Sequence, residues 1–166
     1  MFILDKLNNP GTTIQGEKWN FFTDGVMGGR SSGGTSIEEY KEKICYRMTG
    51  KVTTENNGGF IQMRVEIIPP LPSFKYAGVY LNAFGNNHKY AIHIRTPYTI
   101  APWQYYTSNF LLKDQWTDIK LPFVNFKKSN FYQPKSLQYH QIKTVGIVAA
   151  FDDFYADIAV SNIGFY

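Results

Sequence analysis

Apolar and polar residues alternate one position at a time along much of the chain. In residues 61–67 the two kinds of side chain occupy odd and even positions: Ile61, Met63, Val65 and Ile67 against Gln62, Arg64 and Glu66. Successive side chains of a strand point to opposite faces of a sheet, so this pattern predicts a half-buried strand. We expect it to end at Pro69-Pro70, because proline lacks the N–H that a sheet ladder needs.

Similar patterns predict strands in four further segments: 44–48, 116–123, 143–151 and 154–166. Residues 143–151 are mostly apolar, as in a strand that is covered on both faces. Two alternating segments, 78–83 and 90–95, lie on the two sides of the turn sequence GNNHK at 85–89, and we predict that they pair as a β-hairpin. His88 in that turn, and His93 between core positions, are then expected to face solvent.

Helical periodicity is weak, and only residues 36–43 and 134–141 suggest short helices. The predicted strands are short and are separated by clusters of Gly, Pro and Asn. No linker or internal repeat divides the chain. We therefore predict an all-β fold, an antiparallel β-sandwich, in a single domain over residues 1–166.

The composition supports a core rich in large side chains. Of the 166 residues 17% are aromatic, with 12 Tyr and 13 Phe, and only 18% are charged. Aromatic residues favour strands and fill the space between sheets. The single cysteine, Cys45, excludes an internal disulfide and favours a reducing compartment.

Segment lengths and charge bear on location and partners. The N-terminus lacks the basic segment and the apolar run of an export signal, and no apolar run approaches the about 20 residues of a transmembrane helix. We expect a cytoplasmic protein, at most peripheral to a membrane complex. The net charge of +4 is spread along the chain, so we expect neither nucleic acid nor a membrane surface as a partner.

The sequence holds no recognisable catalytic motif. Its three histidines have no metal-ligand spacing, and no nucleophile elbow, P-loop or dinucleotide fingerprint occurs. The adjacent pairs Asp152-Asp153 and Glu38-Glu39 would point to opposite faces of a strand, so neither is an acid/base couple. We expect no catalytic residue, no metal ion and no cofactor, with a calcium site at Asp152, Asp153 or Asp157 as an open alternative.

Residues 19–34, WNFFTDGVMGGRSSGG, have the most specific local composition of the chain, with five glycines in sixteen positions. Glycine disfavours a helix or a central strand, so we predict a shaped loop. The Gly28-Gly29 pair lets the chain bend or another backbone approach closely, and Gly25 suits a positive φ. Val26 and Met27 then form an apolar tip between the glycines.

Two interpretations of this loop stay open. In the first, Asp24 closes an Asx-turn onto the amide two residues ahead, and the loop is a buried plug at one end of the domain. In the second, the backbone amides around Gly28, Gly29 and Ser31 bind a ligand or a protein partner together with the Arg30 side chain.

A second candidate site is the aromatic segment 98–106. Trp103 and Tyr105 lie two positions apart and share a face if the segment is extended. They would then form a flat platform for a sugar ring or for apolar side chains of a partner. The alternative is that these residues, with Tyr98 and Tyr106, cover the core.

The loop resembles the signature W-x-x-x-[ST]-D-G-V-M-G-G-x-S of the complex I intermediate-associated protein 30 family. Later segments are similar to blocks of that family in the same order: NNGGFIQMR at 56–64, the segment 76–96, WTDIKLPFVNF at 116–126 and the closing DFYADIAVSNIGFY. The resemblance extends from about residue 19 to the last residue, and the signature positions are Trp19, Asp24, Gly25, Val26, Met27, Gly28, Gly29 and Ser31.

This resemblance implies a galactose-binding-like jelly roll and a non-catalytic assembly or scaffolding role. We therefore expect an assembly or stability factor for a membrane-associated respiratory or photosynthetic electron-transfer complex, whose partners are protein subunits. It would contact them through the signature loop, Arg30 included, and through neighbouring aromatics. The alternative is a jelly-roll carbohydrate-binding module that stacks a sugar on Trp103 and Tyr105.

Overall fold

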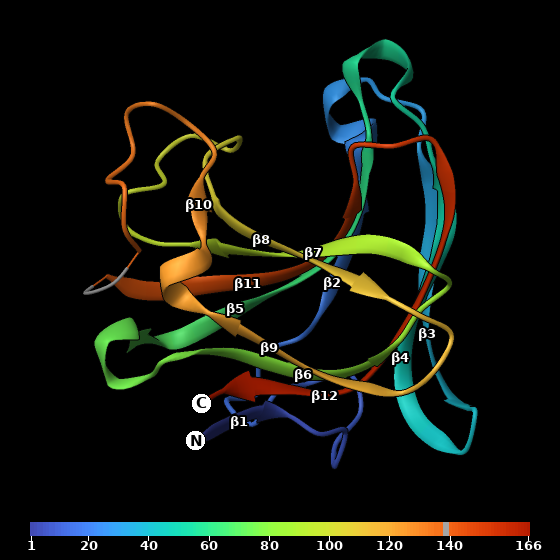
Figure 1. Cartoon of the computed structure of the whole chain (residues 1–166), viewed down its shortest axis with the longest axis horizontal. Helices are drawn as coiled ribbons and strands as arrows, with labels where there is room; N and C mark the ends of the chain where they lie inside the picture. The colour runs from blue at the N-terminus through green and yellow to red at the C-terminus, as the bar shows by residue number, and fades with distance from the viewer. Residues whose placement is uncertain (138–139) are drawn as a thin grey trace.

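The computed structural model describes residues 1–137 and 140–166, and it is built of strands joined by turns and short 3-10 helices (Figure 1). The strands are β1 (Phe2–Asp5), β2 (Asn20–Thr23), β3 (Ser32–Tyr40), β4 (Lys43–Val52), β5 (Phe60–Pro72), β6 (Gly78–Phe84), β7 (His88–Arg95), β8 (Tyr106–Leu112), β9 (Thr117–Pro122), β10 (Lys127–Lys128), β11 (Gln141–Ala150) and β12 (Phe154–Phe165). The 3-10 helices are η1 (Asp24–Met27), η2 (Glu55–Asn57), η3 (Ser73–Lys75) and η4 (Phe123–Asn125).

The strands form two six-stranded sheets. The first has the order β3-β4-β12-β6-β9, with β1 also paired to β12, and the second has the order β10-β8-β7-β11-β5-β2. All of these pairings are antiparallel. In Figure 1 the first sheet follows the lower and right-hand sides of the view, and the second crosses its centre. The predicted all-β sandwich is confirmed.

Alternation places the apolar side chains between the two sheets. The odd-numbered residues of 61–67 in β5 and the even-numbered residues of 90–94 in β7 are all 2% exposed or less. The first sheet contributes the facing layer, which includes Met48, Leu81, Ile158 and Phe165. Because the period is two, the intervening residues of β5, β7 and β11 project onto the outer face of the second sheet.

The predicted strand end at Pro69-Pro70 is wrong, because β5 continues to Pro72. β2 pairs only with residues 61–64 of β5, so among the described strands β11 is the sole neighbour of β5 at the prolines. The pairing with β11 also shifts register there, between Ile142 and Thr144. A sheet edge at a bulge needs no proline N–H, so the strand tolerates both prolines.

The predicted hairpin is also wrong, since its two strands form as expected but belong to different sheets. β6 pairs with β12 and β9, whereas β7 pairs with β11 and β8. The turn between them donates hydrogen bonds to the end of β8, from Gly85 N to Lys113 O (2.9 Å) and from Asn87 N to Leu112 O (2.8 Å). A Cβ on Gly85 would lie 2.4 Å from Cβ of Leu112, so a glycine is needed where the chain crosses between sheets.

Neither suggested helix appears in the described residues. Residues 36–43 form the hairpin of β3 and β4, with Lys41 and Glu42 at positive φ in its turn. Pairing with β4 overrides the weak helical pattern. Residues 134–137 are not helical, His140 forms a bend and Gln141 begins β11, while residues 138–139 of the suggested helix lie outside the described residues.

Candidate functional site

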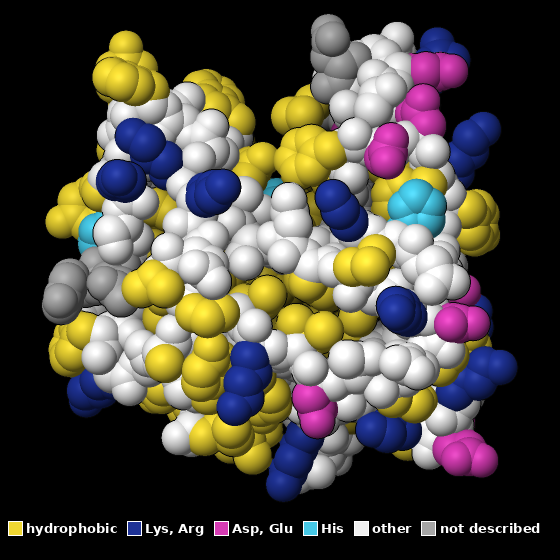
Figure 2. Space-filling model, in the orientation of Figure 1, with side chains coloured by type: hydrophobic (Ala, Val, Ile, Leu, Met, Phe, Trp, Pro, Cys, Tyr) yellow, Lys and Arg dark blue, Asp and Glu magenta, His cyan; other side chains and the backbone are white. Residues whose placement is uncertain are grey.

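The outer face of the second sheet is the floor of a cleft. We call this surface the cleft floor, and its residues come from β2, β5, β11, β7 and β8: Phe22, Phe60, Gln62, Arg64, Thr144, Gly146, Val148, Ala91, His93, Arg95, Thr107 and Asn109. Figure 2 shows the hollow, open at the upper edge of the view between two lobes. At one end it continues into a pocket of about 370 Å³ that Ala91, Asn109 and Phe151 help to line.

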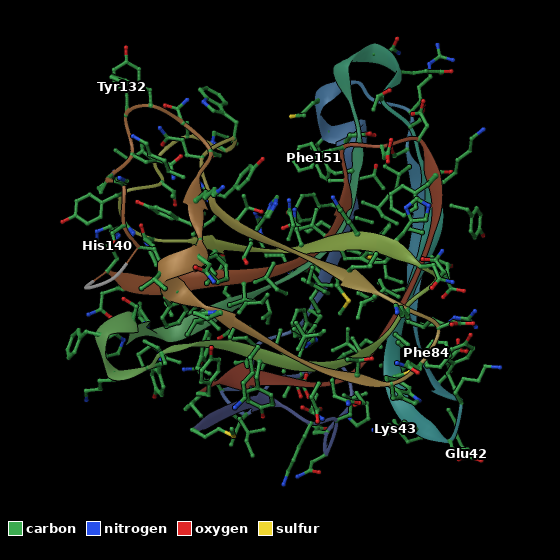
Figure 3. All side chains as sticks on the ribbon, viewed as in Figure 1. Glu42, Lys43, Phe84, Tyr132, His140 and Phe151 are labelled. Carbon is green, nitrogen blue, oxygen red and sulfur yellow. The ribbon has the colours of Figure 1, made fainter. Side chains whose placement is uncertain are left out.

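Loops stand on both sides of the cleft floor (Figure 1). The first lobe consists of the loops 96–105 and 129–134, which Ser129 ties together, since its hydroxyl accepts a hydrogen bond from Tyr105 N (2.8 Å). The second lobe consists of η1, η2 and the turn between β11 and β12. Figure 3 shows Tyr132 projecting outward from the first lobe and Phe151 on the second lobe beside the cleft. Loops carried by a rigid scaffold are a common place for binding residues.

A stacked aromatic pair lies on the cleft floor. The rings of His93 and Tyr105 are 3.9 Å apart between centroids and 10° from parallel. The prediction that His93 faces solvent is wrong: the side chain is 8% exposed, because Tyr105 covers it. Burial lowers the pKa of His93 to about 3, so the imidazole is neutral at pH 7 and offers one donor and one acceptor.

Two arginines flank the central strand β11. Arg64 of β5 lies opposite Gly146, and Arg95 of β7 lies opposite Thr144. Gly146 leaves space for a neighbouring side chain, since a Cβ there would lie 2.3 Å from Oε1 of Gln62. The amide of Gln62 therefore lies over the middle of the floor, between the two arginine positions.

The contacts of these arginines are unusual for cations. The Arg64 guanidinium lies over the ring of Phe22, 4.8 Å from its centroid. Arg95 Nη2 donates to two carbonyl oxygens of the first lobe, those of Thr99 (2.8 Å) and Ala101 (3.1 Å). Burial, and then the positive charge of Arg64, lower the pKa of Arg95. The ion pairs of the described chain involve neither arginine.

Unpartnered polar atoms concentrate on the cleft floor. Five buried side-chain polar atoms of the described residues have no hydrogen-bond partner, and four of them belong to His93 (Nε2), Arg95 (Nε), Thr107 (Oγ1) and Thr144 (Oγ1). By register Thr107 lies opposite His93 and Thr144 opposite Arg95, so the four residues are contiguous on three neighbouring strands. Each such atom costs about 1–3 kcal/mol, and this concentration is typical of a ligand site rather than of a packed surface.

The glycine-rich loop forms a second buried polar cluster, the Asp24 cluster, whose hydrogen bonds are complete. Asp24 is 0% exposed and accepts from Ser31 N (2.9 Å), Ser31 Oγ (2.6 Å) and Gly59 N (2.6 Å). Burial acts to raise the pKa of Asp24, but these hydrogen bonds lower it below its ordinary value. Gly29 and Gly58 pack on the carboxylate, because a Cβ on either would lie 2.4 Å from it.

The backbone amides of this loop are used within the loop. Gly28 N donates to Gly25 O (3.1 Å) and Gly29 N to Asp24 O (2.9 Å), so neither is free to bind a ligand. The predicted Asx-turn is wrong, since the Asp24 carboxylate accepts from the amides of Ser31, Gly59 and Phe60 and not from the amide two residues ahead. The turn of this kind is made one residue earlier, where Thr23 Oγ1 accepts from Gly25 N (3.0 Å). The positive φ falls on Gly28, at 85°, instead of Gly25. The geometry therefore favours the plug interpretation for the backbone of the loop.

A family model of complex I intermediate-associated protein 30 (CIA30) matches residues 9–160. The chain belongs to the CIA30 family. No curated protein matches the sequence. The Asp24 cluster gives a physical reason for the polar and glycine positions of the signature loop, because Asp24, Gly29 and Ser31 touch one another within it.

Several solved structures share the fold of this CIA30 chain. A family 11 carbohydrate-binding module from Clostridium thermocellum, in complex with a β-1,3-1,4-mixed-linked tetrasaccharide, is 15% identical with a TM-score of 0.76, over 99% of this chain and 94% of that chain. The family 11 module of a cellulosomal cellulase of Clostridium thermocellum is 15% identical with a TM-score of 0.74, over 98% and 92%. A family 30 carbohydrate-binding module is 14% identical with a TM-score of 0.55, over 83% and 92%. These similarities confirm the predicted jelly-roll sandwich.

The structure separates the predicted site residues of this CIA30 chain. Val26 and Met27 are 72% and 58% exposed on the second lobe, and Arg30 is exposed nearby. Trp19 lies before the other end of β2, where its Nε1 donates to Asp5 Oδ2 (2.8 Å). The loop signature thus combines residues that hold the loop with residues that project from it.

The two predicted aromatic residues also differ in their surroundings. Tyr105 lies against His93 on the cleft floor, whereas Trp103 is 63% exposed in the turn before β8. Among the described rings Trp103 has no stacking partner, and the structure therefore does not join it to Tyr105 in one platform.

Sequence reasoning missed the residues of the cleft floor. Arg64, His93 and Arg95 were predicted only as polar faces of half-buried strands. The available signal was the presence of bulky cationic and imidazole side chains at alternate positions of otherwise apolar segments. Their assembly depends on β11 lying between β5 and β7, which the alternation does not encode.

Metal-binding and membrane-spanning features are absent from the part of the chain that the structure describes. No group of three or more His, Cys, Asp or Glu side chains could hold a metal there. Two aspartates of the calcium alternative have other contacts: Asp157 pairs with Arg47 (2.8 Å), and Asp153 accepts from Thr54 N (2.7 Å). No helix in the same residues has the length and apolar character to cross a bilayer.

Proposed function

We propose that the protein is a non-catalytic binding module that acts as an assembly or stability factor for a membrane-associated electron-transfer complex. Membership of the CIA30 family supports this role, since the family is described by association with an intermediate of complex I. The observation that carries the proposal is the exposed apolar tip of η1, Val26 and Met27, on the second lobe beside the cleft (Figure 2). A protein subunit of the complex covers this tip.

The tip is held in place before any partner arrives. Thr23 caps η1 at one end, and Gly28 and Gly29 donate back to the helix at the other. An apolar side chain fixed in this way loses little conformational entropy when a partner covers it. Burial of each side chain then contributes about 1.5–3 kcal/mol to association.

The chemistry of the cleft floor supports a non-catalytic role. His93 is neutral, and Glu66 is the only carboxylate that the registers of β5, β7 and β11 place on this face of the described chain. Acid/base hydrolysis of the glycosidase type uses two carboxyl groups. The floor therefore has groups that bind and orient a ligand but lacks that pair.

The test is complementation in the native host. A strain without the gene is expected to accumulate less of one respiratory or photosynthetic complex on native gels, and the wild-type gene restores it. The double variant Val26→Asp with Met27→Asp is expected to fail to restore it while remaining folded. Ile14→Asp is the matched control, because Ile14 is also 72% exposed but lies in the N-terminal loop. Equal complementation by all three proteins, or no change in any complex, overturns the proposal.

A second candidate function, the binding of an oligosaccharide in the cleft, is favoured by the unpartnered atoms of the cleft floor. Sugar hydroxyls donate and accept hydrogen bonds, so they satisfy threonine, imidazole and guanidinium groups alike. The aromatic side chains Tyr105 and Phe22 stand at the two sides of the floor for stacking. The tetrasaccharide complex of the family 11 module shows that a related fold binds saccharide.

A glycan array followed by calorimetry tests this second function. Binding is expected for at least one oligosaccharide, and it is expected to weaken at least tenfold when His93→Phe removes the imidazole nitrogens. Trp103→Ala is the companion variant, because it separates a contribution of the first lobe from that of the floor. The absence of binding to every glycan would remove the second function and leave the assembly role unaffected.

A further inference from the structure

We propose that the cleft floor recognises an acidic saccharide, and that Arg64 and Arg95 bind its carboxylate or sulfate group. The inference rests on the second function above, saccharide binding in the cleft, and adds the charge of the ligand.

Arg47 in the first sheet shows how a structural arginine is accommodated. Its Nε and Nη2 donate to the two oxygens of Asp157 (3.0 and 2.8 Å), and its Nη1 donates to Glu38 (3.2 Å). The guanidinium also lies over the ring of Tyr40, 4.0 Å from its centroid. Two carboxylates thus neutralise a half-buried cation, as is usual for partly buried charges.

Arg64 and Arg95 have no carboxylate of this kind. Arg95 Nη2 donates hydrogen bonds to the carbonyl oxygens of Thr99 and Ala101, and the buried Nε of Arg95 has no partner in the described chain. Glu66 is the nearest carboxylate by register, yet it is exposed and forms an ion pair with neither arginine. Two half-buried cations on one face, without a counter-charge, are complementary to an oxyanion.

The register places these cations on the two sides of β11. Strands in a sheet are about 4.8 Å apart, so the backbones of β5 and β7 are separated by about 10 Å across β11. The two guanidinium groups are close enough for the charge of Arg64 to lower the pKa of Arg95, so one oxyanion on this face interacts with both. The amide of Gln62 lies over Gly146 between them, and the hydroxyl of Thr144 is buried beside it without a partner.

The other unpartnered groups favour a saccharide as the carrier of the oxyanion. Thr107 Oγ1, Thr144 Oγ1 and His93 Nε2 match hydroxyl groups, which donate and accept. A sugar ring carries several hydroxyl groups close to its acidic group, whereas a peptide residue supplies one N–H and one C=O. The stacked ring of Tyr105 adds a surface on which the apolar side of a sugar ring can rest.

The test is calorimetric titration of the whole protein with matched pairs of oligosaccharides. One pair is an oligogalacturonide and its methyl ester, which differ in the carboxylate charge. The other is a carrageenan oligosaccharide and its desulfated form, which differ in the sulfate. In one pair the acidic member is expected to bind about tenfold tighter than the neutral one, and more weakly at high salt. The pair that shows this preference distinguishes a carboxylate from a sulfate.

Variants connect the preference to the two arginines. Arg64→Gln is expected to reduce it below about threefold with little change in neutral binding, because Arg64 contributes charge and lies over the Phe22 ring. Arg95→Gln gives the same result if the first lobe keeps its fold, and Arg95→Lys retains the charge as a second variant. Lys51→Gln, an exposed cation of β4 in the other sheet, is the control and leaves the preference intact.

The possible failures are distinguishable. Equal binding of acidic and neutral members overturns the inference and leaves saccharide binding in the cleft standing. A preference that persists in both Arg64→Gln and Arg95→Gln assigns the charge recognition elsewhere and also overturns it. Arg64-dependent binding of a poly-glutamate peptide, with no binding of any saccharide, overturns the saccharide class itself and the second function with it.

Discussion

The Asp24 cluster and the cleft floor both bury polar groups, but they differ in whether those groups are partnered. Asp24 accepts hydrogen bonds from Ser31, Gly59 and Phe60, so both oxygens of its buried carboxylate are hydrogen-bonded. On the cleft floor, nitrogen and oxygen atoms of His93, Arg95, Thr107 and Thr144 remain without a partner in the described chain. A completed polar network specifies structure, whereas an incomplete one leaves donors and acceptors for water or for a ligand.

The same contrast separates the two interpretations of the signature loop. Its amides, its carboxylate and its glycines act on one another, as a structural plug requires. The side chains of Val26, Met27 and Arg30 project from it. The two proposed functions therefore draw on different features: partner binding on the rigid apolar tip of the loop, and saccharide binding on the polar groups of the floor.

The largest expected effect is that of Asp24→Ala. It removes the acceptor of several hydrogen bonds and leaves the amides of Ser31 and Gly59 buried without a partner. We expect the free energy of unfolding to fall by about 3–5 kcal/mol, measured by urea denaturation. Asp114→Ala, at an exposed position, is expected to leave the urea midpoint unchanged. A loss below about 1 kcal/mol would show that the network is not structural.

Gly29→Ala tests the same cluster from the backbone side. The new Cβ would lie 2.4 Å from Cγ of Asp24, so the carboxylate must move and its hydrogen bonds must stretch. We expect a loss of about 2–3 kcal/mol by urea denaturation. Gly34→Ala is the matched control, because nothing lies within 4 Å of its Cβ position, and it is expected to be neutral. Equal stability of the two variants would contradict the tight packing on Asp24.

The sequence predicts the strands well and their partners poorly. Alternation identifies β5, β7, β11 and β12 because side-chain period depends on local geometry alone. It fails at Gly85, where the chain crosses to the other sheet, since a hairpin and a crossing begin with the same kind of turn. It fails at Pro69-Pro70 because the length of β2 decides whether β5 has a free edge there.

The candidate site follows the same division. The signature loop could be found because its residues are contiguous, and the apolar tip follows from the position of Val26 and Met27 between glycines. The cleft floor could not be found from the sequence, since Arg64 and His93 are 29 positions apart. They come together because β11 lies between their strands. A polar residue at an alternate position of a strand is predicted to face solvent unless the loop that covers it is known. His93 is an example, because the ring of Tyr105 covers it.

The pH dependence of stability is expected to report on His93. Its pKa is about 3 in the folded protein and about 6.5 in the unfolded chain, so only the unfolded chain takes up this proton between those values. The contribution of His93 to the free energy of unfolding is therefore constant above pH 6.5. Below pH 6.5 the free energy of unfolding decreases, until the pH reaches about 3. Burial also lowers the pKa of His140, which adds a loss of the same sign.

The variant His93→Phe isolates this contribution. Between pH 7.5 and pH 4.5 the wild type is expected to lose about 2 kcal/mol more stability than the variant, by urea unfolding at both values. The contribution of Asp24 is unchanged over this range, because its pKa lies below its ordinary 3.8 and its stabilisation is lost only at lower pH. Identical pH profiles of the two proteins would mean that His93 is hydrated in the folded state.

The smallest expected effect gives the sharpest contrast between the two regions. Thr107→Val removes an unpartnered hydroxyl at nearly constant shape, so stability is expected to change by less than about 0.5 kcal/mol or to rise. Ser31→Ala removes a hydroxyl bonded to Asp24 (2.6 Å) and is expected to cost about 1–3 kcal/mol. If Thr107→Val is as costly as Ser31→Ala, the hydroxyl on the floor is structural after all. If Thr107→Val leaves the free energy of unfolding unchanged but weakens saccharide binding, the hydroxyl of Thr107 binds the ligand.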